Sequence, residues 1–339
     1  MICRVRTIVA LLVLAAPVVA GAQQVEIQEW EVPYEQSRPR DPYVAPDGKV
    51  WFVGQRTHYV ASFDPKTGEF KKFDLPAGAG PHNLIVDEKG TIWYTGNRVA
   101  NIGKVDPKTG EVKTFPMPDS LVRDPHTMII GNDGQHMFFT AQGANHVGRF
   151  TPATGEVKVV KVQTPRARPY GIEQDSKGTV WVNLFGSNKL AQVDPATLAI
   201  TEISLPRPDA RGRRIAITSD DKIWYVDYAG GYLGRYDPAT QQFKEWRAPS
   251  AAESRPYAMT VDDQDRLWFV ETGPSPNNLV GFDPKTEQFF SVTPIQSGGG
   301  AVRHMVFHEP TRTIWFGTDE NTLGRADVGG MTATDKPIP

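Results

Sequence analysis

Histidine, arginine and tyrosine recur at one place in a repeating pattern along this chain. Three of the seven histidines occupy that place. The seven residues are Arg40, His82, His126, Tyr170, Arg213, Tyr257 and His304. A neutral imidazole can remove a proton, a guanidinium binds carboxylate and carbonyl oxygens, and a phenol offers a flat face with a polar tip. If these side chains meet, they form a pocket for a small polar molecule. The alternative is that they fill a channel and bind water.

A recurring tryptophan defines the repeat and therefore the place of these residues. Its spacings run from 42 to 47 residues. The positions are Trp51, Trp93, Trp181, Trp224, Trp268 and Trp315, with Phe138 in the third repeat. Counting eleven residues back from each, and twelve in the longer third repeat, gives the seven polar residues. A period of about 40 to 50 residues is typical of propellers and related repeat folds.

Each repeat predicts four short strands joined by turns. In the second repeat these strands are 83–86, 92–94, 102–105 and 112–116. Five repeats carry an Asp-Pro pair, in which proline presets the turn and the aspartate side chain bonds nearby backbone N–H groups. No long apolar period typical of a helix follows the N-terminal segment. The sequence therefore predicts an all-β fold, a seven-bladed β-propeller with four-stranded blades. The tryptophans are expected to pack between blades.

The two ends of the repeat region predict how the ring closes. The seventh repeat stops near Ala326, before an outer strand, whereas residues 25–33 form a surplus strand at the start. We expect this N-terminal strand to complete the last blade, which leaves no open sheet edge. Residues 23–328 would then be a single propeller domain, and residues 329–339 a loosely ordered tail.

The first 22 residues resemble a secretory signal peptide. Arg4 and Arg6 precede an apolar segment at 8–20, which ends in Ala20-Gly21-Ala22, a typical cleavage site. The alternative is a membrane anchor, but the apolar segment is short for a span. The single cysteine, Cys3, lies in this segment, so the mature chain would have no disulfide or thiolate. We expect a periplasmic or secreted protein.

The composition and charge of the chain exclude some classes of binding partner. The formal net charge is −2, and no long basic run occurs, so nucleic acid is not expected. No nucleotide-binding or other cofactor motif is present, so no organic cofactor is expected. We expect a monomer that is not inserted in a membrane and binds a small molecule.

More charged residues are expected at the same end of the channel. Arg303 adjoins one of the seven positions, and carboxylates follow the tryptophan strands of the last three repeats. These carboxylates are Asp227, Glu271, Asp319 and Glu320. The opening would be cationic on one side and acidic on the other; the alternative is a network of exposed ion pairs.

The Trp-Phe strands, the Pro81-His82 opening and the Asn-Thr-Leu-Gly-Arg segment at 321–325 resemble the streptogramin (virginiamycin B) lyase family over roughly residues 25–327. The resemblance implies a seven-bladed propeller that opens a cyclic depsipeptide by eliminating an ester C–O bond. It implies His304 as general base and a magnesium ion, for which Asp319 is the nearest match. On this lyase hypothesis the residues around the channel opening would bind substrate, and Glu271 is a second candidate metal ligand. The expected substrate-binding residues are Arg40, His82, His126, Tyr170, Arg213, Tyr257 and Arg303.

Two departures from the family pattern keep other functions open. Tyr257 stands where the family has a second histidine, and Val302 stands where it has a metal-binding acid. Since Mg²⁺ needs several oxygen ligands, the metal site is weakened. The alternatives are a non-catalytic propeller that binds a ligand or protein in the cell envelope, and a metal-dependent hydrolase similar to gluconolactonases.

Overall fold

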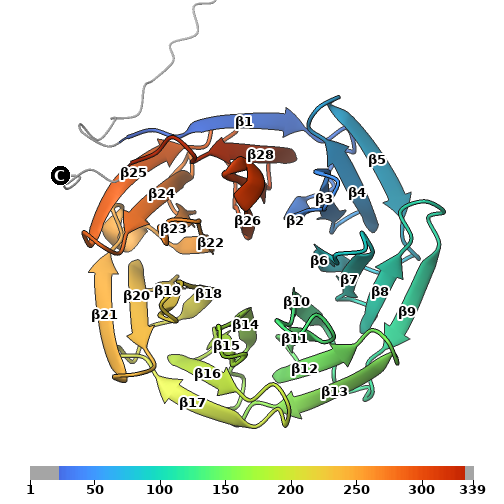
Figure 1. The fold of residues 1–339 in the computed structure, drawn as a ribbon, viewed down its shortest axis with the longest axis horizontal. Helices are drawn as coiled ribbons and strands as arrows, with labels where there is room; N and C mark the ends of the chain where they lie inside the picture. Colours follow the sequence, from blue (N-terminus) through green and yellow to red (C-terminus); the bar gives the residue numbers. More distant parts are fainter. Residues whose placement is uncertain (1–22, 333–339) are drawn as a thin grey trace, which may run out of the picture.

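The computed structural model describes residues 23–332, and in that range the chain forms seven four-stranded antiparallel sheets around one axis (Figure 1). This arrangement confirms the predicted fold class. The two helices among the described residues are single 3₁₀ turns, η1 (Ala251–Glu253) and η2 (Glu309–Thr311). Neither is long enough to cross a membrane. The proposed signal peptide and most of the predicted tail lie outside the described residues.

The blades follow the chain in order. Blade 1 holds β2 (Pro39–Val44), β3 (Val50–Gly54), β4 (Tyr59–Asp64) and β5 (Glu69–Asp74). Blade 2 holds β6 (Pro81–Val86), β7 (Ile92–Gly96), β8 (Asn101–Val105) and β9 (Val112–Pro116). Blade 3 holds β10 (Pro125–Ile130), β11 (Met137–Ala141), β12 (His146–Thr151) and β13 (Glu156–Lys161). Blade 4 holds β14 (Pro169–Gln174), β15 (Val180–Leu184), β16 (Lys189–Val193) and β17 (Ile200–Ser204).

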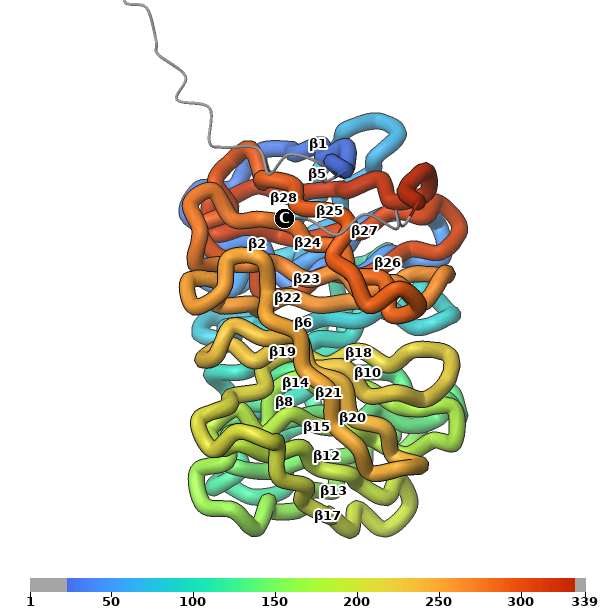
Figure 2. The backbone as a smooth tube through the Cα atoms, turned by 90° about the vertical axis from the view of Figure 1, so that its left-hand side faces the viewer, coloured from blue at the N-terminus to red at the C-terminus, as the bar shows by residue number. Residues whose placement is uncertain are grey.

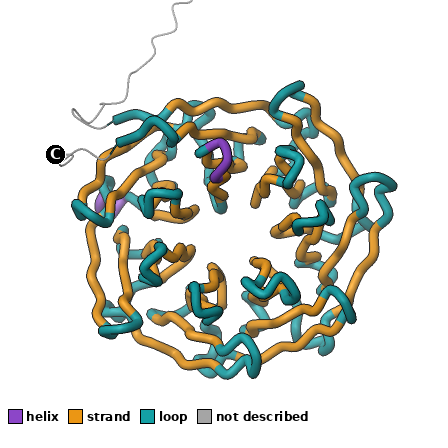
Figure 3. The backbone as a smooth tube through the Cα atoms, viewed as in Figure 1, coloured by secondary structure: helices purple, strands orange, loops and turns teal. Residues whose placement is uncertain are grey.

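Blade 5 holds β18 (Gly212–Ile217), β19 (Ile223–Asp227), β20 (Tyr232–Asp237) and β21 (Gln242–Arg247). Blade 6 holds β22 (Pro256–Val261), β23 (Leu267–Glu271), β24 (Asn278–Asp283) and β25 (Gln288–Pro294). Blade 7 holds β26 (Met305–His308), β27 (Thr313–Gly317), β28 (Thr322–Asp327) and the N-terminal β1 (Glu26–Glu31). Figure 3 shows that strands make up every blade from the channel to the rim.

The N-terminal strand closes the ring as predicted. β1 pairs antiparallel with β28 from Glu26↔Asp327 to Glu31↔Thr322. Trp30 in β1 stacks on Trp315 of blade 7 at 5.6 Å between ring centroids and lies 4.9 Å from Phe63 of blade 1. One aromatic side chain thus joins the first and last blades, while the outer edge of blade 7 is covered by the start of the chain.

The recurring tryptophans are core residues. Trp181, Trp224 and Trp268 are at most 1% exposed, and Trp224 packs on Phe282 of the next blade at 5.7 Å. Asp106 accepts hydrogen bonds from the backbone N–H groups of its own turn, as expected for the Asp-Pro pairs. The residues that recur in every repeat, the tryptophans and the Asp-Pro pairs, therefore have structural roles. Residues that differ between repeats are the candidates for function.

The disc has two different faces (Figure 2). On the crossover face, loops such as 32–38 bring the chain from one blade to the inner strand of the next. On the turn face lie the hairpins within blades, such as 45–49 and 65–68. Every inner strand begins at the crossover face and runs along the axis toward the turn face. Position along an inner strand therefore sets depth in the axial channel.

Candidate active site

The pairing of each inner strand with the tryptophan strand gives the true register of the axial residues. In blade 1, Tyr43 pairs with Trp51, eight residues later. In blade 7, Val306 pairs with Trp315, nine residues later, because η2 lengthens the hairpin. The place of Arg40, three residues before Tyr43, is therefore taken by Arg303 in blade 7. His304 lies one place deeper, so the count of eleven residues was wrong for the seventh repeat.

The residues at the outermost place form an axial ring near the crossover face. Their side chains touch one another: the His82 and His126 rings are 3.6 Å apart and those of His126 and Tyr170 are 4.2 Å apart. The Tyr170 and Tyr257 hydroxyls are hydrogen-bonded. Six of the residues predicted to bind substrate meet here, and with Arg303 they are called the axial ring: Arg40, His82, His126, Tyr170, Arg213 and Tyr257. Arg303 holds the matching place in blade 7, and its guanidinium is paired with Asp319.

A guanidinium group of the axial ring lies against aromatic faces. The Arg213 guanidinium lies 3.5 Å from the centroid of Tyr257 and 5.2 Å from that of Tyr170. Burial alone would raise the pKa of Tyr170, but Arg213 and the other arginines lower it. Burial also lowers the pKa of His82 and His126 well below the ordinary value, and the nearby arginines add to this. These two histidines are therefore neutral, and the arginines carry the positive charge of the ring.

One place deeper, a polar layer crosses the axis. Asp41 accepts hydrogen bonds from Arg40 Nε at 2.9 Å and Asn83 Nδ2 at 3.2 Å, and it lies 3.5 Å from Arg214 Nη2. Arg214 in turn donates to Thr127 Oγ1 at 3.0 Å and to the Arg303 carbonyl at 2.9 Å. Blades 1, 2, 3, 5 and 7 are thereby tied together across the channel.

Sequence reasoning missed Asp41 and Arg214 because it considered one place in each repeat. A signal was available in the adjacent pairs Arg40-Asp41 and Arg213-Arg214. The inner strands of blades 1 to 6 have an irregular register near their start, for example between Arg40 and Tyr43 in blade 1. Such a bulge re-aims side chains, so two successive residues can serve the axis rather than alternating between two faces.

His304 belongs to this polar layer. Its Nδ1 is buried and has no hydrogen-bond partner among the described residues. Burial and then Arg214 lower the pKa of His304 to about 4, while Asp41 acts in the opposite direction. Arg40 of the axial ring and Arg214 of the polar layer bring two guanidinium groups to the single Asp41 carboxylate, so a net positive charge remains beside the imidazole. His304 is therefore a neutral base over the ordinary pH range.

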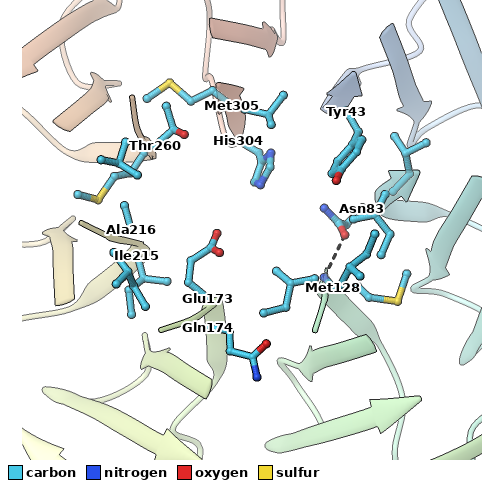
Figure 4. Close-up of a pocket in the computed structure, with 18 residues that line it drawn as sticks. Tyr43, Asn83, Met128, Glu173, Gln174, Ile215, Ala216, Thr260, His304 and Met305 are labelled. Carbon is cyan, nitrogen blue, oxygen red and sulfur yellow. Dashed lines mark hydrogen bonds between the residues drawn. The ribbon is translucent and has the colours of Figure 1, made fainter. Parts of the chain in front are cut away.

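An axial cavity of about 320 Å³ lies between the polar layer and the turn face. His304 and Asn83 border it on the side of the polar layer, and its wall combines polar side chains with apolar ones, including three methionines: Met128, Met259 and Met305. Figure 4 shows the His304 imidazole and the Glu173 carboxyl pointing into the cavity from blades 7 and 4. A small, largely apolar molecule with a few polar groups would suit this space.

Glu173 is the acidic residue of this cavity. Its carboxyl group makes no hydrogen bond with the described residues, and burial raises its pKa to about 7 even though Arg214 acts in the opposite direction. The sequence contained no signal for it, since Glu173 stands at a place that other blades fill with Tyr43, Ile85 or Thr260. A carboxyl group that lines a cavity without a hydrogen-bond partner and has a shifted pKa is a candidate functional group.

The two carboxylates expected to bind magnesium have other partners. Asp319 is paired with Arg303 and lies 3.4 Å from Arg38 Nε. Glu271 is fully buried and accepts hydrogen bonds from the N–H and hydroxyl of Ser250, at 2.8 and 2.6 Å, in the preceding crossover loop. Among residues 23–332, no group of three or more His, Cys, Asp or Glu side chains is placed to hold a metal. The donor set does not fit a magnesium ion.

The fold and the axial centre define the class: a seven-bladed propeller in which the inner strands gather basic, aromatic and acidic side chains around one channel. The family model described as the virginiamycin B lyase family matches residues 13–275. The chain belongs to this family, as the sequence motifs indicated. No curated protein matches the sequence at a significant level.

Solved structures agree on the fold. Virginiamycin B lyase from Staphylococcus aureus is 23% identical with a TM-score of 0.81, and the match covers 90% of this chain and 99% of that one. A catalytically inactive variant of that enzyme with quinupristin is 24% identical, with the same TM-score and coverage. Kuenenia stuttgartiensis hydrazine synthase is 13% identical with a TM-score of 0.70, covering 86% of this chain and 96% of that one.

Proposed function

We propose that this protein is a carbon–oxygen lyase in which His304 is the general base and the substrate occupies the axial cavity. The observation that carries the proposal is a neutral imidazole that borders this cavity and has no hydrogen-bond partner for its Nδ1. Family membership supports an elimination, and the inactive variant reported for the Staphylococcus aureus enzyme replaces a histidine.

The proposed reaction starts with proton removal from carbon. His304 takes the proton from the carbon next to a carbonyl group, and negative charge develops on the carbonyl oxygen. Arg40 and Arg214 exceed the Asp41 carboxylate by one positive charge, so the polar layer favours this developing enolate. The C–O bond at the next carbon then breaks, a C=C bond forms, and no water is consumed.

The cavity limits the substrate. A volume of about 320 Å³ is at the lower end for drug-sized ligands and does not suit a macrocyclic depsipeptide. We therefore propose a small β-oxygenated carbonyl compound, linear or cyclic, rather than a streptogramin. Export to the periplasm or beyond would bring such compounds to the protein from outside the cell.

A non-catalytic binding propeller is the second candidate. The observation that favours it is the mutual contact of the axial ring side chains, of which Arg40, His82, His126, Tyr170 and Tyr257 are at most 6% exposed. Such a ring can be a structural plug beneath which the cavity simply holds a ligand. This reading predicts stoichiometric binding without product.

The test is turnover of a panel of small β-oxygenated esters and lactones in ¹⁸O-labelled water. We expect an unsaturated product without ¹⁸O, and a loss of kcat/KM of at least about 100-fold in His304→Gln. Glu69→Gln, a change at an exposed residue of β5 outside the cavity, is the control and should retain activity. Full turnover by His304→Gln, or ¹⁸O in the product, would overturn the lyase assignment.

A further inference from the structure

We propose that Glu173 is the general acid of the axial cavity: it gives its proton to the departing oxygen while His304 takes the proton from carbon. This inference rests on the proposed lyase function but goes further, since it names a second catalytic residue and the leaving group. It assigns the site to β-alkoxy and β-hydroxy carbonyl compounds, whose leaving oxygen must be protonated.

The placement of the two groups carries the inference. Glu173 comes from β14 in blade 4 and His304 from the start of β26 in blade 7, so they enter the cavity from different sides of the axis (Figure 4). Neither side chain is hydrogen-bonded to another described residue through the group that would act. A molecule in the cavity can therefore meet an imidazole at one atom and a carboxyl group at another.

Other charged and titratable groups near Glu173 are few. Arg214 of blade 5 acts on it from the polar layer, and the Tyr43 hydroxyl of blade 1, itself influenced by Asp87, approaches from across the cavity. Around His304 lie Arg40, Asp41 and Arg214. No described cation forms a salt bridge with Glu173, so its carboxyl group is free to hold a proton.

The surroundings shift the pKa values of His304 and Glu173 in opposite directions. Burial lowers the pKa of His304 to about 4 and raises that of Glu173 to about 7. Between these values the imidazole is neutral and the carboxyl group is protonated, which are the states that a base and an acid need. Two titratable groups in one cavity whose pKa values are pushed apart are a typical acid–base pair.

The proton and electron balance is complete without a further reactant. The Cα–H bond breaks and its proton goes to His304. The electron pair left on Cα forms the new C=C bond, and the Cβ–O bond breaks with its electron pair on oxygen. That oxygen takes the proton of Glu173 and leaves as an alcohol or water. His304 and Glu173 then exchange one proton with solvent to restore the starting state.

The leaving group distinguishes this site from an ester-opening one. When an ester C–O bond is eliminated, a carboxylate leaves, and a carboxylate needs no proton. An alkoxide is a far poorer leaving group, for which general acid help is worth about 100-fold to 10,000-fold. A protonated Glu173 therefore indicates that the substrate of this chain releases an alcohol or water.

The experiment compares two leaving groups on one carbon skeleton. Glu173→Gln and the parent protein are assayed on a β-methoxy ketone and on its para-nitrophenoxy counterpart, whose phenolate leaves without protonation. We expect Glu173→Gln to lose at least about 100-fold in kcat/KM on the methoxy substrate and to keep its rate on the nitrophenoxy substrate. The alkaline limb of the pH profile, near pH 7, should vanish in the variant. Glu69→Gln, the same change at an exposed residue of β5 outside the cavity, should change neither rate.

The outcomes separate the two proposals. If Glu173→Gln slows both substrates equally, or neither, while His304→Gln abolishes both, the general-acid role is refuted and the lyase function stands. If His304→Gln retains both activities, the lyase function itself fails. Gln replaces a protonated carboxyl group with a neutral group of similar size, and an unchanged circular dichroism spectrum confirms that the variant is folded.

Discussion

The ion pairs of Asp41 are the strongest test of the axial architecture. Asp41 is fully buried, and its partners Arg40 and Arg214 are 4% and 3% exposed. In Asp41→Ala, both guanidinium groups would remain buried without their carboxylate. Breaking a buried ion pair by removing one partner costs about 3–5 kcal/mol. We therefore expect Asp41→Ala to lower the free energy of unfolding by about this amount at pH 7.

Urea unfolding, followed by tryptophan fluorescence, measures this loss. Asp47→Ala is the matched control, because Asp47 is 59% exposed and its nearest cation, Lys49, is 3.9 Å away. That variant should stay within about 0.5 kcal/mol of the parent. Arg40 and then His304 and Arg214 lower the pKa of Asp41 against its burial, so the stability that Asp41 contributes is present above the unfolded pKa and lost as the pH falls below it. The difference between Asp41→Ala and the parent should therefore shrink in acid.

A double-mutant cycle completes the test. Replacing Asp41 and Arg214 together by residues of similar shape, Asp41→Asn with Arg214→Met, should be less damaging than the sum of the single changes, because no unpaired charge from this pair remains. A loss below about 1 kcal/mol in Asp41→Ala would refute the reasoning. The cross-axis link would then be an incidental contact rather than part of what holds the channel.

Three further predictions follow from the same structure. Trp30→Ala should cost about 3 kcal/mol in urea unfolding and Trp30→Phe much less, since Trp30 joins blades 7 and 1; equal stability of all three proteins would contradict closure by β1. Glu173→Gln should be more stable than the parent by up to about 3 kcal/mol at pH 8, but not at pH 4. Folding raises the pKa of Glu173 from 4.5 to about 7, so the free-energy cost of ionising Glu173 in the folded protein grows between these two pH values. Thermal denaturation at pH 4 and pH 8 measures the difference. Chelation by EDTA should leave turnover unchanged, because Asp319 and Glu271 are engaged by arginines and by Ser250; a loss restored by Mg²⁺ would contradict this.

The fold was predictable from the sequence because its signals are local and repeated. The tryptophan period, the Asp-Pro turns and the surplus strand at 25–33 each depend on a few neighbouring residues. Together they gave the blade number and the closure of blade 7 correctly. The axial ring was predictable for the same reason, since one place in each repeat faces the axis.

The exact depth of each side chain along the channel axis was not predictable from the sequence. One added residue in the blade 7 hairpin moves His304 from the axial ring into the polar layer. The spacing between successive tryptophans includes every loop of a repeat, so it does not reveal which loop carries the added residue. Glu173 was missed for a different reason. Its significance comes from burial and from the absence of a cation bonded to it, and both depend on residues of other blades.

The position of Arg214 links these layers in one physical argument. This side chain lies across the channel, contacts Asp41, Thr127 and the Arg303 backbone, and acts electrostatically on both His304 and Glu173. Its charge disfavours imidazolium, which keeps His304 neutral, but it favours ionised Glu173, which opposes the protonated form. Burial must therefore dominate at Glu173, and a substrate that expels water from the cavity strengthens that effect. Closing the cavity over an apolar substrate would thus favour the protonated acid while the neutral base is retained.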